Sequence, residues 1–127
     1  MGMTDDQPTV TVLVVEDEAL VRMLVVQALE EAGFSVCEAG EAQAAMALLR
    51  ADDGIGLMVT DVGLPGVNGR RLADQARAHR PGMKVLFMTG YADSALVEKS
   101  LPHGFGLITK PFDLDDLTAR AQALMAA

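Results

Sequence analysis

Short runs of β-branched residues alternate along the chain with longer stretches rich in Ala and Leu. The first run, Thr9–Val15, is almost entirely β-branched, which is typical of a strand buried on both faces of a sheet. Further short apolar runs follow it at intervals. The pattern therefore predicts five strands, at Thr9–Val15, Phe34–Glu38, Ile55–Thr60, Val85–Met88 and Gly106–Thr109.

The stretches between these runs have helical periodicity. Gly33 stands where the C-cap of the first helix is expected, and Asn68 and Asp113 are predicted N-caps of later helices. In the first helix Leu20, Leu24 and Ala28 share one face, with Val21, Val25 and Ala32 beside it. The predicted helices are Ala19–Ala32, Glu41–Ala51, Gly69–His79, Ser94–Ser100 and Leu114–Met125.

Alternation of strands and helices indicates parallel βαβ units with right-handed crossovers. We therefore predict an α/β fold, a doubly wound open five-stranded parallel sheet flanked by five helices. The length of 127 residues fits one domain. We place this domain at residues 9–127 and expect residues 1–8, which are polar and acidic, to be poorly ordered.

Composition narrows the range of partners. The net charge of −8 makes nucleic acid an unfavourable partner, and we interpret Arg70, Arg71, Arg77 and Arg80 as an ordinary solvated helix face. Cys37 is the only cysteine, so no intrachain disulfide can form and a reducing compartment is the default. No signal sequence or membrane-spanning apolar run is present, which predicts a cytoplasmic protein with no membrane partner.

Polar residues follow the predicted strands where each one ends. Glu16, Asp17 and Glu18 come after the first strand, and Asp61, Thr89 and Lys110 come after the third, fourth and fifth. Ligands of open parallel sheets bind at the carboxyl ends of the strands, so these groups should converge. Clustered carboxylates repel one another unless a cation binds, and Mg²⁺ prefers oxygen ligands. An Asp nucleophile beside a cation and a Lys suits phosphoryl transfer.

Four segments then resemble the response-regulator receiver family of two-component signalling. They are VLVVEDE (Val12–Glu18), TDVGLPGVNG (Thr60–Gly69), LFMTGYA (Leu86–Ala92) and ITKPF (Ile108–Phe112). The resemblance covers the chain from about Val10 to Met125 and implies the flavodoxin-like receiver fold. It also implies a phosphorylation-activated signalling module rather than an enzyme with an external substrate, one that catalyses only its own phosphorylation and dephosphorylation.

The resemblance assigns a role to each strand-end residue. Asp61 is implied as the phosphoacceptor, with Lys110 holding a phosphoryl oxygen and Thr89 sensing the phosphoryl group. Mg²⁺ is the implied cofactor, bound by Asp17, Asp61 and the backbone carbonyl of Gly63, with Glu16 acting through a water. A cis Lys110–Pro111 peptide bond is also expected.

The sequence departs from the usual receiver pattern at the switch aromatic. Many members have Tyr or Phe three residues before the Lys, where this chain has Leu107. The aromatic here is Tyr91, two residues after Thr89, as in receivers of hybrid histidine kinases and a subset of stand-alone receivers. Tyr91 either takes part in the switch or only packs its loop.

The implied partners are a histidine kinase or a histidine phosphotransfer protein, and a homodimer through the fourth helix, fifth strand and fifth helix. Output would pass through protein contacts or onward phosphotransfer. A haloacid-dehalogenase phosphatase is an alternative, but it expects a second Asp where this chain has Gly63. A degenerate receiver that binds partners without phosphorylation is a further alternative.

Overall fold

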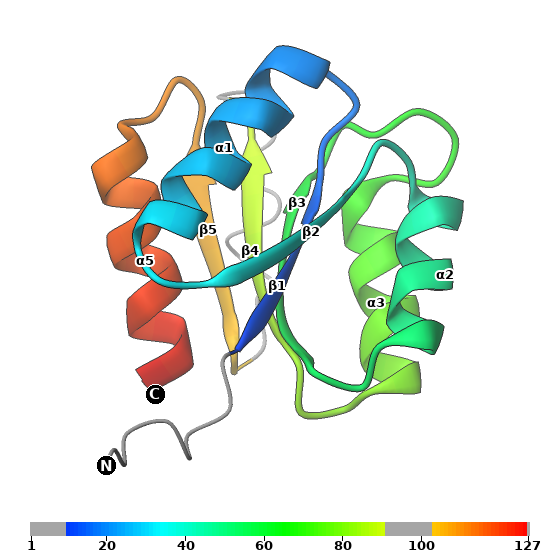
Figure 1. Cartoon of the computed structure of the whole chain (residues 1–127). Coiled ribbons are helices and arrows are strands. Elements are labelled where there is room, and N and C mark those ends of the chain that lie inside the picture. The colour runs from blue at the N-terminus through cyan, green and yellow to red at the C-terminus, as the bar shows by residue number, and fades with distance from the viewer. Residues whose placement is uncertain (1–9, 91–102, 127) are drawn as a thin grey trace, which may run out of the picture.

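A five-stranded parallel sheet forms the centre of the computed structural model, which describes residues 10–90 and 103–126 (Figure 1). The strand order is β2-β1-β3-β4-β5, and every neighbouring pair is parallel. The prediction of a doubly wound open parallel sheet is therefore confirmed, and strand ends differ from the predicted ones by no more than two residues. The strands are β1 (Thr11–Val15), β2 (Ser35–Ala39), β3 (Ile55–Asp61), β4 (Lys84–Thr89) and β5 (Phe105–Thr109).

Helices cover both faces of the sheet. Figure 1 shows α1 (Ala19–Glu31) and α5 (Leu114–Ala126) on one face, and α2 (Ala42–Ala51) and α3 (Gly69–His79) on the other. Four of the five predicted helices therefore lie within the described residues. The predicted helix at 94–100 lies outside them, as do the first eight residues, which we expected to be poorly ordered.

The core consists of two apolar layers separated by the sheet. Alternate residues of β1 supply both layers: Leu13 and Val15 pack toward α2 and α3, whereas Val12 and Val14 pack toward α1 and α5. All four side chains are fully buried. This arrangement explains why β1 is a continuous apolar run, since a strand covered on both faces needs no polar side.

The buried face of α1 differs from its most conspicuous apolar stripe. Val25 and Leu29 are fully buried against Val12 and Val14, whereas Leu20 and Leu24 are 64% and 40% exposed. Residues four apart lie on one side of a helix, so the Val25–Leu29 row faces the sheet and the Leu20–Leu24 row faces away from it. Helical spacing placed Val25 beside the Leu20–Leu24 row, but only packing showed that Val25 and Leu29 enter the core.

The predicted helix ends are confirmed by their hydrogen bonds. The Asn68 side chain accepts a bond from the Arg71 amide at 2.9 Å, and the Asp113 carboxylate accepts one from the Asp115 amide at 2.8 Å. Gly33 follows α1 with a φ of +101°, a conformation that a side chain would disfavour. These local contacts satisfy amides at the helix N-termini and set where the chain turns.

The four arginines in and directly after α3 are not a uniform solvated face: Arg71 is exposed, whereas Arg70, Arg77 and Arg80 are half-buried, so that interpretation was wrong for three of them. Arg80 donates hydrogen bonds to the carbonyls of Ile55, Leu49 and Asp52 at 2.8, 2.9 and 3.1 Å. The Arg77 guanidinium lies 4.8 Å from the centre of the Phe105 ring. Both side chains are half-buried because they cover backbone and aromatic groups of other elements.

Candidate functional site

The residues singled out at the strand ends meet at the carboxyl edge of the sheet. Glu16 directly follows β1, Asp61 is the last residue of β3, and Lys110 directly follows β5. Three of the groups lie in direct contact, because the Lys110 ammonium donates to Glu16 Oε1 at 2.9 Å and to Asp61 Oδ2 at 2.8 Å. The expected convergence of these residues is thus present in the fold.

Lys110 joins two buried carboxylates. Glu16 is fully buried and Asp61 is 8% exposed, so each would be costly as an unpaired charge. Loss of water around Lys110 lowers its pKa, but its hydrogen bonds to Asp61 and Glu16 outweigh that effect, and the pKa is raised overall. The lysine therefore stays protonated and neutralises part of the negative charge of the site.

Glu16 is held at both carboxylate oxygens. Oε1 accepts from Lys110, and Oε2 accepts from the Glu18 amide at 3.0 Å. Burial raises the pKa of Glu16, and the nearby Asp61 charge acts in the same direction, while the hydrogen bonds from Glu18 and Lys110 oppose them. The carboxylate is fixed in position but is repelled by the charge of Asp61.

Asp17 completes a group of three acids. One oxygen each of Glu16, Asp17 and Asp61 can be chosen so that all lie within 4.8 Å of one another. The Asp17 side chain is exposed, whereas the other two are buried. A set of hard oxygen donors with one solvent-facing side fits a Mg²⁺ ion that keeps several waters. Glu18, also singled out in this run, is exposed and lies outside this group.

The loop after Asp61 folds back over the acceptor. The Gly63 amide donates to Asp61 Oδ1 at 2.9 Å, and the Gly69 amide donates to the Val62 carbonyl at 2.9 Å. A Cβ on Gly69 would overlap the Asp61 carbonyl oxygen and lie 2.8 Å from its carbonyl carbon. Glycine at this position therefore allows α3 to begin directly against the backbone of the acceptor. The Gly63 carbonyl, expected to bind metal, remains a prediction.

Thr89 and Leu107 lie on neighbouring strands. Thr89 is buried at the end of β4, where its hydroxyl donates to the Gly90 carbonyl at 3.2 Å. Leu107 on β5 is half-buried and packs against the apolar layer beneath α2 and α3. The Lys110 amide donates to the Thr89 carbonyl at 2.7 Å, which ties the two strand ends together. Tyr91 lies outside the described residues.

The Lys110–Pro111 peptide bond is cis, as expected from the resemblance.

One residue at this edge was not recognised from the sequence. Arg22 on α1 donates through Nη1 to the Glu16 carbonyl at 2.6 Å and through Nε to Glu38 Oε1 at 3.0 Å. Its only sequence signal was a cation one turn after Glu18 in an otherwise apolar stretch. That signal does not distinguish a solvated arginine from one that binds the site loop.

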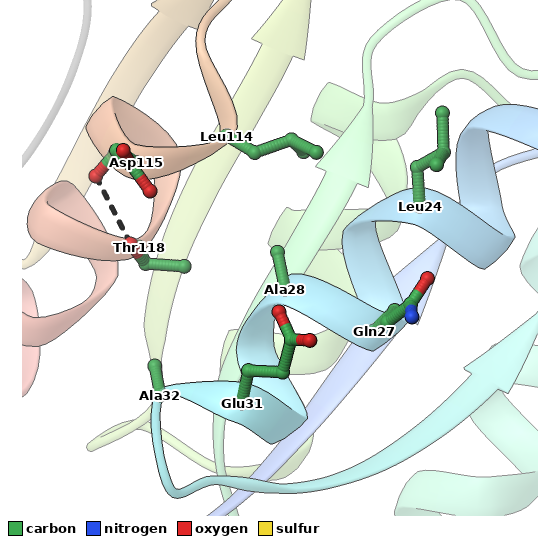
Figure 2. Close-up of a pocket in the computed structure, with 8 residues that line it drawn as sticks. All are labelled: Leu24, Gln27, Ala28, Glu31, Ala32, Leu114, Asp115 and Thr118. Atoms are coloured by element: carbon green, nitrogen blue, oxygen red, sulfur yellow. Dashed lines mark hydrogen bonds between the residues drawn. The ribbon is translucent and has the colours of Figure 1, made fainter.

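A groove runs between α1 and α5. Figure 2 shows Leu24 and Ala28 of α1 opposite Leu114 of α5, with Glu31 near one end of the groove. Its volume is about 410 Å³. Leu24 and Leu114 also line an apolar depression that includes Lys110. The surface next to the acidic cluster is therefore apolar as well as open.

Comparison with known proteins identifies the family. The response regulator receiver domain model matches residues 12–122. The response regulator receiver protein CpdR of Brucella abortus is 32% identical over 117 residues, which cover 91% of this chain and 97% of that protein. The sensor kinase CckA of the same organism is 35% identical, but its match covers 96% of this chain and only 13% of the kinase.

Solved structures agree with this result. A response regulator receiver protein from Sinorhizobium medicae superimposes with a TM-score of 0.84 at 27% identity, covering 94% of this chain and 96% of that one. Sequence and structure together match over nearly the whole chain. It belongs to the response regulator receiver domain family of two-component signalling.

Proposed function

We propose that this receiver is switched by Mg²⁺-dependent transfer of a phosphoryl group to Asp61. The observation that carries the proposal is the position of Asp61, which is buried between a protonated lysine and two further carboxylates. A carboxylate in such a place can attack phosphorus while neighbouring cations balance the charge of the transferred group. This arrangement also argues against a degenerate receiver.

The proposed reaction forms an acyl phosphate. An oxygen of Asp61 attacks the phosphorus of the donor, the bond from phosphorus to the leaving group breaks, and the leaving group departs with that electron pair. Lys110 then exchanges its bond to Asp61 Oδ2 for one to a phosphoryl oxygen. The Gly63 amide keeps the other carboxylate oxygen of Asp61 in place at 2.9 Å.

The metal would be held by Asp17, Asp61 and the Gly63 carbonyl, and by Glu16 through a water. Bound Mg²⁺ would supply positive charge to the transferring phosphoryl oxygens and would relieve repulsion among the three acids. Lys110 alone cannot balance three carboxylates, so the residues present leave room for a further cation.

Thr89 would report the modification. Its hydroxyl bonds only to the neighbouring Gly90 carbonyl among the described residues, a contact that it can exchange for a phosphoryl oxygen. Movement of Thr89 would shift the segment that follows β4, including Tyr91. We extend the proposal to an output surface formed by that segment, β5 and α5, through which a second copy would dimerise or a partner would bind.

The phosphoryl donor would be a histidine kinase or a histidine phosphotransfer protein, in the cytoplasm. The exposed apolar row on α1 and the apolar depression that includes Lys110 would offer such a protein a contact surface close to Asp61. Coverage differs widely among relatives, from 97% of CpdR to 13% of CckA, so the donor and output of the whole protein are part of the proposal.

The test uses acetyl phosphate as donor and intact-protein mass spectrometry as readout. Wild-type protein with Mg²⁺ should gain one base-labile phosphoryl group, and EDTA should prevent the gain. Asp61→Asn, which keeps the shape of the side chain without its nucleophilic charge, should gain none. The matched control is Asp53→Asn, because Asp53 is an exposed acid that precedes β3 and does not belong to the acidic cluster.

Two results would contradict the proposal. If Asp61→Asn gains the same mass as wild type, the acceptor is a different residue. If wild type gains no mass under conditions where Mg²⁺ binds, the chain is a receiver that acts without phosphorylation.

A further inference from the structure

Asp17 differs from the other two acids of the cluster in how its carboxylate is held. Lys110 and the Glu18 amide hold Glu16, and Lys110 and the Gly63 amide hold Asp61. Within residues 10–90 and 103–126, no hydrogen bond or ion pair fixes the exposed Asp17 side chain. Its position therefore depends on the backbone that carries it.

The backbone before Asp17 is held by Arg22. The Glu16 carbonyl accepts a bond from Arg22 Nη1 at 2.6 Å, which is short and charge-assisted. A peptide unit is planar, so fixing the Glu16 carbonyl also fixes the direction of the Asp17 N–H and Cα. On the other side of Glu16, its amide donates to the Ala39 carbonyl at 3.1 Å. The turn that presents Asp17 is thus held between β2 and α1.

Arg22 is itself oriented by a second contact. Its Nε pairs with Glu38 of β2 at 3.0 Å, and the arginine side chain is only 23% exposed. A Cβ on Gly40 would come within 3.3 Å of Nη1, closer than most such contacts, so the glycine leaves space for the guanidinium. The planar guanidinium can reach a carbonyl and a carboxylate together, which an ammonium group cannot do with the same geometry.

We infer that Arg22 is a positioning residue that holds the Glu16–Asp17 peptide in the conformation that presents the Asp17 carboxylate to a divalent cation. The inference rests on the proposed function, since it assumes that the acidic cluster binds Mg²⁺. It adds a residue of α1 to the site residues already named, which are the acids, Thr89 and Lys110. Arg22 acts through the backbone and does not touch the metal or the phosphoryl group.

Charge alone predicts the opposite effect. Arg22 is a cation near three acids, so removing it would strengthen Mg²⁺ binding if Coulomb interactions were its main contribution. Removing a positioning residue weakens binding, because Asp17 then samples orientations that do not face the cation. A residue that only stabilises the fold changes the melting temperature and leaves the Mg²⁺ affinity of the folded protein unchanged. The direction of the change distinguishes these roles.

The experiment is an NMR titration with MgCl₂, followed through the Asp61 and Gly63 amides of the metal-free protein. We expect Arg22→Ala to raise the Mg²⁺ dissociation constant about 10-fold, the lower end of the effect of removing a group that orients metal ligands. Arg22→Lys keeps the charge without the planar group, and it should also bind Mg²⁺ more weakly than wild type. This variant tests the inference if Arg22→Ala does not fold.

Arg120→Ala is the matched control. Arg120 also pairs with one carboxylate, Asp116 at 3.3 Å, and donates to one backbone carbonyl, Leu107 at 2.8 Å, but neither partner belongs to the acidic cluster. The Mg²⁺ affinity of the Arg120→Ala variant should equal that of wild type. Unchanged or tighter binding in the folded Arg22 variants would overturn the inference alone. Failure of wild type to bind Mg²⁺, or unchanged binding in Asp17→Asn, would overturn the proposed metal site and the inference with it.

Discussion

Gly69 shows how one residue without a side chain supports the acceptor. It is the first residue of α3 and is buried against the backbone of Asp61. A Cβ there would overlap the Asp61 carbonyl group and come within 2.9 Å of the Val62 Cα. The atoms in the way are backbone atoms of β3 and its loop, which cannot move aside as a flexible side chain could.

Gly69→Ala should therefore lower the free energy of unfolding by about 3 kcal/mol, the upper part of the range for overpacking. The variant molecules that do fold should also accept a phosphoryl group from acetyl phosphate more slowly, because relief of the clash displaces Asp61. Urea denaturation and the mass-spectrometric assay measure the two effects.

Gly82→Ala is the control for this substitution. A Cβ on Gly82 would meet no atom within 4 Å, and the φ of this glycine is not positive. The stability of the variant should stay within about 0.5 kcal/mol of wild type. Equal stability of the two variants would show that the helix start can move away from β3 at no cost.

At the scale of elements, Arg80 joins three of them. From the end of α3 it reaches the last turn of α2 at Leu49, the residue after α2 at Asp52, and the start of β3 at Ile55. Backbone carbonyls at a helix C-terminus have no partners within the helix. Arg80 supplies donors to these groups, which fixes the α2–β3 connection against α3.

Arg80→Ala should destabilise the fold by about 3 kcal/mol, since it leaves carbonyls that were bonded to a charged donor without it. Arg80→Lys should recover only part of the loss, because one ammonium group cannot match the separate nitrogens of the guanidinium. Urea denaturation measures both.

Arg50→Ala is the appropriate comparison, because Arg50 is an exposed arginine in the last turn of α2. It should change stability by no more than about 0.5 kcal/mol. A loss as large as that of Arg80→Ala would indicate a general effect of charge near the C-terminus of α2 instead of the specific hydrogen bonds.

At the scale of the whole molecule, folding brings the acids of the cluster together at a cost in charge repulsion. Three carboxylates are brought within 4.8 Å of one another when the sheet forms, with Lys110 as the ammonium group bonded to two of them. In the unfolded chain the same acids are separated and hydrated. A ligand that binds only the folded state stabilises it by mass action.

Mg²⁺ at ten times its dissociation constant should therefore stabilise the fold by about 1.4 kcal/mol and raise the melting temperature by roughly 5 °C. Scanning calorimetry with MgCl₂ and with EDTA measures this shift. Asp17→Asn should remove most of it, whereas Glu18→Gln, a change in an exposed neighbour outside the group of three, should retain it. A wild-type melting temperature indifferent to Mg²⁺ would contradict the metal site.

The sequence alone determined the order and type of the described elements, the helix ends at Gly33, Asn68 and Asp113, and the side chains at the strand ends. These features depend on neighbouring residues, through the periods of strands and helices and the hydrogen bonds of caps such as Asn68 and Asp113. The convergence of Asp61 and Lys110 also followed, because parallel strands place all their carboxyl ends at one edge.

Only the tertiary structure decided which row of α1 is buried, that Arg80 binds the α2–β3 connection, and that Arg22 holds the Glu16 carbonyl. The contact between Glu16 and Lys110 joins residues 94 positions apart, and the bonds of Arg80 span 25 to 31 positions. Such contacts depend on how separate elements pack and which side-chain rotamers that packing allows, and local patterns carry no information about either. An arginine on a helix therefore looks the same in the sequence whether it faces water or a carbonyl of another element.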